Sequence, residues 1–206
     1  PNGIDFDRFH NGSKYQRKIF DKKTIIFVGR LEPVKGVEYL IKAMEILRNK
    51  DENISLIMIG DGSQREILED LVKNLHLEKR ITFKGEIPND DIPKFLHQAD
   101  VFVLPSVSEG FPNVILEAMA AGLPIVSTNV NGLSEIIIDN ENGYLVEPEN
   151  PERLAQKVTE LLINQNICRT MSENNIKKAK TFSWESVVCI LESIYTDILK
   201  MYAGGK

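Results

Sequence analysis

The sequence predicts an α/β fold built on a doubly wound, parallel sheet of six strands. Two observations predict it. Short apolar segments alternate with helical ones about six times, and the segment at 24–28 is apolar without interruption, as in a strand buried on both faces. Clusters of glycine and charged residues also follow the predicted strands, at their carboxyl ends. Because ligands bind at that edge of such sheets, we expect one binding crevice there.

The predicted elements can be read in order along the chain. Strands are expected at 24–28, 55–59, 81–83, 101–104, 124–127 and 143–146. Helices are expected at 63–75, 90–99, 114–121 and 132–137, and an apolar repeat indicates another that includes Val37, Leu40, Ile41, Met44 and Leu47. Asn150 and Pro151 predict the cap and first position of the next helix, and the chain reads as helical from residue 164 on.

The amino-acid composition limits which binding partners, metal sites and cellular compartments are expected for this protein. An apolar content of 42% is ordinary for a globular domain, and a net charge of −5 argues against a general grip on nucleic acid. Cys168 and Cys189 are far apart and are expected to be free thiols, which fits a reducing compartment. The three histidines lack metal-ligand spacing, so no metal site is expected. We therefore expect a cytoplasmic protein, with peripheral contact at the cytoplasmic face of the membrane as an alternative.

The stretch from residue 108 to 122 carries the strongest signal for a site. Asn113 is the predicted N-cap of a helix that ends at Gly122, with Glu109 in the preceding loop and Glu117 about one turn inside the helix. Free backbone N–H groups at 110–114 attract an anion, and the two carboxylates accept hydrogen bonds from hydroxyl groups. A phosphorylated sugar or a nucleotide offers both. The alternative is a loop carboxylate and a surface carboxylate without function.

A second cluster follows the first strand. Arg30 and Lys35 lie beside Gly29 and Gly36, before the next helix. A guanidinium and an ammonium there can stabilise the charge of a leaving diphosphate, as a divalent metal does in other enzymes. The alternative is a pair of solvated surface cations.

These two clusters resemble the signature of the family 4, or group 1, retaining glycosyltransferases of the GT-B fold. Seven residues separate Glu109 from Glu117, and the Gly-Arg to Lys-Gly pattern at 29–36 resembles the diphosphate clamp of that family. The resemblance runs from residue 1 to about residue 195. It implies the C-terminal, nucleotide-sugar-binding domain of a two-domain enzyme whose absent N-terminal domain holds the acceptor, a sugar or a lipid-linked glycan.

The resemblance also implies roles for individual residues. Glu117 would bind the ribose, Glu109 would face the donor sugar, and Arg30 and Lys35 would stabilise the diphosphate. The remaining binding positions would be Gly29 in the clamp, Ile87 at the base, and Gly110, Phe111, Pro112, Asn113 and Val114 around the sugar and diphosphate. The donor would be a UDP- or GDP-sugar, with no cofactor and no metal. The alternatives are a GT-B sugar isomerase or phosphorylase, and a nucleotide-binding module without catalysis.

Two further points follow from the comparison with the family pattern. At 130–135 the chain departs from the usual glycine pair, and Asn131 is expected to tolerate a left-handed backbone there. We expect one domain over 1–206, with 183–206 as a final helix capped by Ser183 and carrying an apolar stripe. That stripe would pack either on the absent N-terminal domain or on this domain's own sheet.

Overall fold

The structure, a computed structural model, describes residues 3–12 and 23–203, and its centre is a six-stranded parallel sheet. The strand order is β3-β2-β1-β4-β5-β6. The bounds are β1 (Lys23–Val28), β2 (Ile54–Ile59), β3 (Ile81–Phe83), β4 (Val101–Leu104), β5 (Ile125–Thr128) and β6 (Gly143–Val146). The predicted fold class and all six predicted strands are confirmed.

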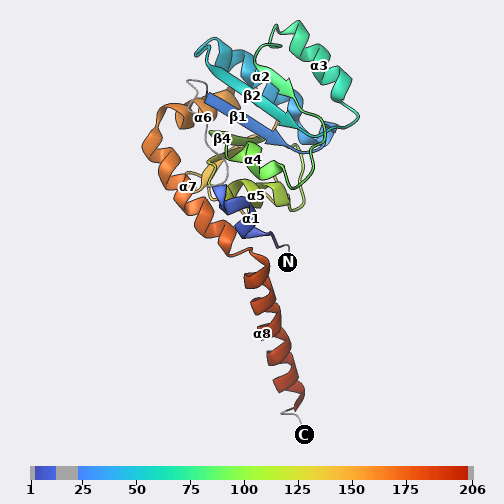
Figure 1. The fold of residues 1–206 in the computed structure, drawn as a ribbon, viewed down its shortest axis with the longest axis vertical. Helices are drawn as coiled ribbons and strands as arrows, with labels where there is room; N and C mark the ends of the chain where they lie inside the picture. Colours follow the sequence, from blue (N-terminus) through green and yellow to red (C-terminus); the bar gives the residue numbers. More distant parts are fainter. Residues whose placement is uncertain (1–2, 13–22, 204–206) are drawn as a thin grey trace.

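Helices cover both faces of the sheet (Figure 1). On one face lie α2 (Val37–Arg48), α3 (Arg65–Asn74) and α6 (Pro151–Ile163). On the other lie α1 (Phe6–His10), α4 (Ile92–Leu96), α5 (Asn113–Ala120) and α7 (Gln165–Lys180). The change of face occurs between β3 and β4, so the chain winds outward from the centre of the sheet in both directions.

The central strands form the core. Ile25, Ile26 and Phe27 of β1 are fully buried, and so is every residue of β4. This burial explains why neither segment shows a polar alternation in the sequence. The loops of the site start at the carboxyl ends of these two buried strands.

Two local predictions around the site are wrong. The helix α5 begins at Asn113, and its N-cap residue is Pro112, whose backbone is extended. The ring of Pro112 fixes only φ, and its ψ of 107° places this residue outside the helix, so the first helical residue is Asn113 and not Val114. The helix expected at 132–137 is replaced by consecutive turns.

Gly132 explains the irregular course of that second segment. Its φ is +82°, and a Cβ at this position would lie 1.4 Å from the carbonyl oxygen of Gly110. Only glycine fits there, because both the left-handed backbone and the close approach exclude a side chain. The left-handed residue is therefore Gly132, whereas Asn131 has no positive φ. The loop after β5 is thus pressed against the loop after β4.

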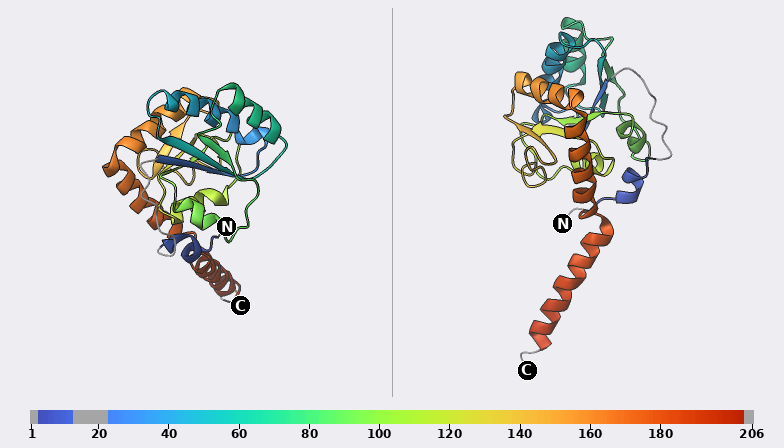
Figure 2. Two further views of the ribbon diagram at one scale, coloured as in Figure 1. Left: turned by 45° about the horizontal axis from the view of Figure 1, so that its top comes forward. Right: turned by 90° about the vertical axis from the view of Figure 1, so that its left-hand side faces the viewer.

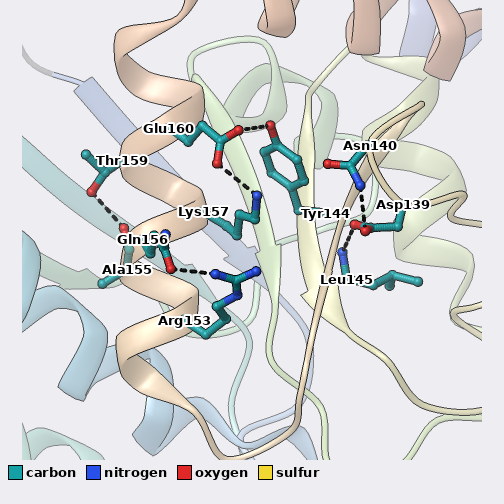
Figure 3. Close-up of polar contacts among 10 residues, drawn as sticks. All are labelled: Asp139, Asn140, Tyr144, Leu145, Arg153, Ala155, Gln156, Lys157, Thr159 and Glu160. Atoms are coloured by element: carbon teal, nitrogen blue, oxygen red, sulfur yellow. Dashed lines mark hydrogen bonds and ion pairs between the residues drawn. The ribbon is translucent and has the colours of Figure 1, made fainter.

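Polar contacts fix the last strand to the helix that follows it (Figure 3). The Tyr144 hydroxyl donates to Glu160 Oε1 at 2.5 Å, and Lys157 Nζ lies 2.8 Å from Glu160 Oε2. Lys157 also sits over the Tyr144 ring, 3.9 Å from its centroid. Burial raises the pKa of Tyr144, so the phenol stays a hydrogen-bond donor at neutral pH. These contacts hold β6 and α6 together at the edge of the sheet.

The final helix, α8 (Trp184–Ala203), extends away from the domain (Figures 1 and 2). Ser183 caps it as predicted, because its Oγ accepts from the N–H of Ser186 at 3.2 Å. Val187 is buried, but the apolar stripe beyond it is open, with Ile194 49% and Leu199 69% exposed. Packing on this domain's own sheet is therefore excluded for that part of the stripe.

The beginning of the described chain meets the base of α8. The N–H of Ile4 donates to the carbonyl of Phe182 at 2.9 Å, and the N–H of Trp184 donates to the carbonyl of Ile4 at 3.1 Å. The first described residues thus lie beside the base of α8. Among the described residues, no helix combines the length and apolarity needed to cross a membrane.

Candidate functional site

The candidate site lies where the direction of strand order reverses, between β1 and β4. The loops that leave the carboxyl ends of these two strands touch. The N–H of Val107 donates to the carbonyl of Val34 at 2.8 Å, and a Cβ on Gly36 would lie 2.3 Å from the carbonyl oxygen of Pro105. Gly36 has a φ of +60° and joins a 3-10 turn, Pro33–Lys35, to α2. The two predicted clusters therefore belong to one site.

Lys35 and Glu109 form an ion pair at the centre of this site. Lys35 Nζ donates to Glu109 Oε1, and the two side chains are only 17% and 9% exposed. The same carboxylate oxygen accepts from the buried Ser106 hydroxyl at 2.8 Å. The buried Thr128 hydroxyl in turn donates to the carbonyl of Ser106. The loop carboxylate is consequently held in one position, with a cation beside it.

Arg30 stands apart from this pair. It is exposed, and it forms no hydrogen bond or ion pair with any residue that the structure describes. Its neighbour Glu32 accepts from both the N–H and the hydroxyl of Ser63, which ties the loops after β1 and β2 together. The hydrogen bond from the Ser63 side chain is the main cause that lowers the pKa of Glu32. Arg30 is therefore an exposed cation, unpaired among the described residues, on a loop that the Glu32–Ser63 hydrogen bonds hold in place.

Glu117 is a carboxylate in an unfavourable environment. It is half-buried on α5, and it has no hydrogen bond or ion pair within residues 3–12 and 23–200. Burial raises the pKa of its carboxyl, and the positive charge of Arg8 opposes that shift. A carboxylate that loses hydration without gaining a partner is costly for folding, and such groups are common at binding sites.

The remaining predicted residues lie around these charges. Pro112 is buried, Gly110 and Asn113 are exposed, and Phe111 and Val114 are half-buried at the start of α5. The first N–H groups of this helix have no carbonyl partner within it, and they point toward the same edge of the sheet. Ile87 lies in the loop after β3, packed partly against the core, and Gly29 donates its N–H to the carbonyl of Ile59.

Two residues beside the predicted site were missed by the sequence analysis. Ser106 directly precedes the stretch at 108–122, and its hydrogen bond to Glu109 becomes visible only when the loop is folded. Arg8 belongs to the opening segment, for which no helix or site residue was predicted. Its position near Glu117 comes from the packing of α1 on α5, for which the sequence carries no local signal.

A cavity of about 630 Å³ lies at the opposite, amino edge of the sheet. Two of its polar side chains have partners within the chain: His97 Nε2 is 2.8 Å from the carbonyl of Phe9, and the Cys168 thiol donates to the carbonyl of Leu161. We assign the site to the carboxyl edge because the charged side chains described above, including the Lys35–Glu109 pair, lie there. Within the described part of the chain, no group of histidine, cysteine and acidic side chains is arranged to hold a metal ion.

Comparison with known proteins decides the family. The model of the family "Glycosyl transferases group 1" matches residues 13–178. The chain belongs to the group 1 glycosyl transferases. An uncharacterized glycosyltransferase of Methanocaldococcus jannaschii is 40% identical over 183 residues, which is 88% of this chain and 46% of that protein. The chain spans about half the length of the curated relatives it matches.

Solved structures agree with this membership. The C-terminal domain of a group 1 glycosyl transferase (LpcC) from Francisella tularensis has a TM-score of 0.76 and 29% identity, over 87% of this chain and 97% of that one. Anabaena HepE in complex with UDP-glucose has a TM-score of 0.82 and 26% identity, over 96% of this chain and 56% of that one. The Rossmann-like α/β fold of this chain is therefore that of GT-B proteins.

The central ion pair can be tested by a double-mutant cycle. We expect Lys35→Met and Glu109→Gln to be coupled by about 1–3 kcal/mol in the free energy of unfolding, since the pair is largely buried and each change strands one charge. Urea denaturation of the two single variants and the double variant measures this coupling. The exposed pair Glu38–Lys42, at 3.3 Å, is the control and should show about 0.3–0.5 kcal/mol. A coupling no larger than that of the control would contradict the arrangement.

Proposed function

We propose that this chain is the donor-binding half of a retaining glycosyltransferase and that it binds a nucleoside-diphosphate sugar at the carboxyl edge of the sheet. The observation that carries the proposal is Glu117, a half-buried carboxylate without a hydrogen-bond or ion-pair partner in the described chain. It lies in the same loop-helix unit as Glu109, which pairs with Lys35. A ribose offers two adjacent hydroxyl groups to such a carboxylate. The UDP-glucose complex of Anabaena HepE supports a nucleotide sugar as the ligand.

In this proposal each charged side chain has a separate task. Glu117 accepts from the ribose hydroxyls, and the first N–H groups of α5 receive the diphosphate. Arg30, which is exposed and unpaired among the described residues, and Lys35 stabilise the negative charge that grows on the diphosphate as the sugar leaves. Glu109, held by Ser106, orients the sugar through its hydroxyl groups. No metal and no cofactor take part.

The transfer itself replaces one bond on the anomeric carbon by another. The bond from that carbon to the diphosphate oxygen breaks, and an acceptor hydroxyl oxygen bonds to the carbon on the same face. The electron pair leaves with the diphosphate, which also takes up the proton of the hydroxyl group. We assign Glu109 a positioning and electrostatic role in this step rather than that of a nucleophile.

We further propose that the acceptor is held by a second domain and that α8 packs on it. The apolar stripe of α8 is open, and Ile4 pairs with the base of the same helix, so the first described residues and the base of α8 lie side by side. A second domain placed there would cover the stripe and close a cleft over the carboxyl edge, which excludes water from the reaction. Cys168 and Cys189 are thiols and not disulfides, which is compatible with a cytoplasmic setting.

The charged residues of the site should control nucleotide affinity. We expect Arg30→Ala and Lys35→Ala each to weaken binding of UDP or GDP about ten- to a hundredfold, because each removes a charge-assisted contact. Isothermal titration calorimetry measures the affinity, and Lys177→Ala on the exposed side of α7 is the matched control. Unchanged affinity in both site variants would make them ordinary surface charges.

The variant Glu117→Gln adds a second readout to the same experiment. It should weaken nucleotide binding without lowering the free energy of unfolding at neutral pH. The sign follows from the raised pKa of Glu117: the protonated form is favoured by folding, and this stabilisation is lost as the pH rises through the folded-state pKa. A neutral glutamine avoids that loss. A large drop in stability would instead assign Glu117 a structural role.

The two-domain proposal concerns the activity of the chain alone. We expect the 206-residue chain to bind a nucleoside diphosphate but to transfer no sugar, since half of a cleft cannot orient an acceptor hydroxyl. Radiolabelled UDP- and GDP-sugars, incubated with a panel of sugar acceptors and with water, measure transfer by the chain and by the longer protein. Robust transfer by the 206-residue chain would contradict the proposal. Sugar phosphate formed from a glycan acceptor only when inorganic phosphate is added would point instead to a phosphorylase.

A further inference from the structure

Three cations lie on the loops that leave β1 and β2 or at the first residue beyond them, and one of the three differs from the others. Lys35 donates to Glu109, and Arg65, the first residue of α3, donates through Nε to the carboxylate four residues on. Arg30 has no hydrogen bond or ion pair among the described residues, although Glu32 follows it by only two positions. A carboxylate so near in the chain is a natural partner for a guanidinium, so the missing pair requires a cause.

Glu32 is engaged by a different residue. Its Oε2 accepts from the Ser63 hydroxyl at 2.6 Å, and its Oε1 accepts from the Ser63 backbone N–H at 3.2 Å. Both carboxylate oxygens therefore bind the loop after β2. One residue with two donors thus holds the carboxylate that lies nearest to Arg30 in the chain.

The two loops are also joined through their backbones beside this contact. The N–H of Leu31 donates to the carbonyl of Asp61 at 2.8 Å, and the N–H of Gln64 donates to the carbonyl of Leu31 at 2.9 Å. Leu31 is fully buried. Removal of the Ser63 hydroxyl would therefore release one oxygen of Glu32 without separating the loops.

Arg30 and Glu32 can reach each other once that oxygen is released. Two residues along a chain span at most about 7 Å between their Cα atoms, which an arginine and a glutamate side chain together bridge easily. The guanidinium of Arg30 would then be occupied by a carboxylate of its own loop. In the proposed function this guanidinium is needed by the diphosphate, so such a pair would compete with the ligand.

We propose that Ser63 is a positioning residue of the donor site, which holds Glu32 away from Arg30 and so leaves the guanidinium free for the diphosphate. This role rests on the proposed function, because a free Arg30 matters only if an anion binds there. Ser63 itself need not touch the ligand. The inference adds the loop after β2 to a site otherwise built from the loops after β1, β3 and β4.

Binding of UDP to a set of variants tests this role. We expect Ser63→Ala to lower the affinity about two- to fivefold, because the ligand must then displace an exposed ion pair. Glu32→Gln should bind at least as tightly as the unchanged chain, since an amide does not compete for Arg30. The double variant Ser63→Ala/Glu32→Gln should match Glu32→Gln, and Ser63→Thr, which keeps a hydroxyl group, should match the unchanged chain.

Isothermal titration calorimetry measures these affinities. Ser55→Ala is the matched control, because it removes a hydroxyl group from the amino end of the same strand, β2, and should leave the affinity unchanged. A double variant that binds as weakly as Ser63→Ala would overturn the proposal, since the hydroxyl group would then only hold the loop in place. Unchanged affinity in Ser63→Ala would overturn it as well.

A measurement without ligand separates this role from the proposed function. We expect the Nε–H proton of Arg30, followed by NMR, to exchange with water more slowly in Ser63→Ala than in the unchanged chain, because the ion pair protects it. The double variant should restore the original rate. Equal rates in all three proteins would overturn the proposal. If UDP binds to none of the proteins, the proposed function fails, while the exchange rate still decides whether Ser63 keeps Glu32 from Arg30.

Discussion

The contact between Lys35 and Glu109 depends on the pairing of β1 with β4. Ile25 lies opposite Val101 and Ile26 opposite Phe102, and this register places the two carboxyl ends side by side. The loops that leave them are then joined through Val34 and Val107, and Gly36 lets them approach closely. An ion pair between residues 74 positions apart is thus a direct result of strand order. The same reversal of strand order creates the crevice in which doubly wound sheets bind ligands.

The two glutamates at this edge of the sheet, Glu109 and Glu117, differ in whether their carboxylates have partners within the chain. The Glu109 carboxylate pairs with Lys35 and accepts a hydrogen bond from the Ser106 hydroxyl. These contacts offset the free energy of burying the carboxylate even when no ligand is bound. Glu117 has no such support beyond the field of Arg8 and is destabilised by burial. A paired carboxylate suits a positioning role, and an unpaired one suits the capture of hydroxyl groups from a ligand. This contrast is the physical basis for assigning the two glutamates to different parts of a nucleotide sugar.

The sequence was informative where burial or topology determines the outcome. Uninterrupted apolar runs such as 101–104 located the strands, and parallel topology then placed Arg30, Lys35 and Glu109 at one edge. It was not informative where one side chain decides the local geometry. Pro112 moved the start of α5 by one residue, and the close approach of Gly132 to Gly110 replaced an expected helix by turns. Arg8 could not be predicted, because its place beside Glu117 depends on long-range packing of α1.

The central claim is that the carboxyl edge, and not the 630 Å³ cavity at the amino edge, binds a nucleoside diphosphate. Backbone amide NMR shifts, followed while the chain is titrated with UDP, GDP and ADP, test it most directly. We predict that the shifts cluster at residues 29–36 and 106–117 and near Ile87 for at least one of the three. Shifts centred on Gly122, Leu162 and Cys168 around the 630 Å³ cavity, or no shifts with any of the three, would contradict the account.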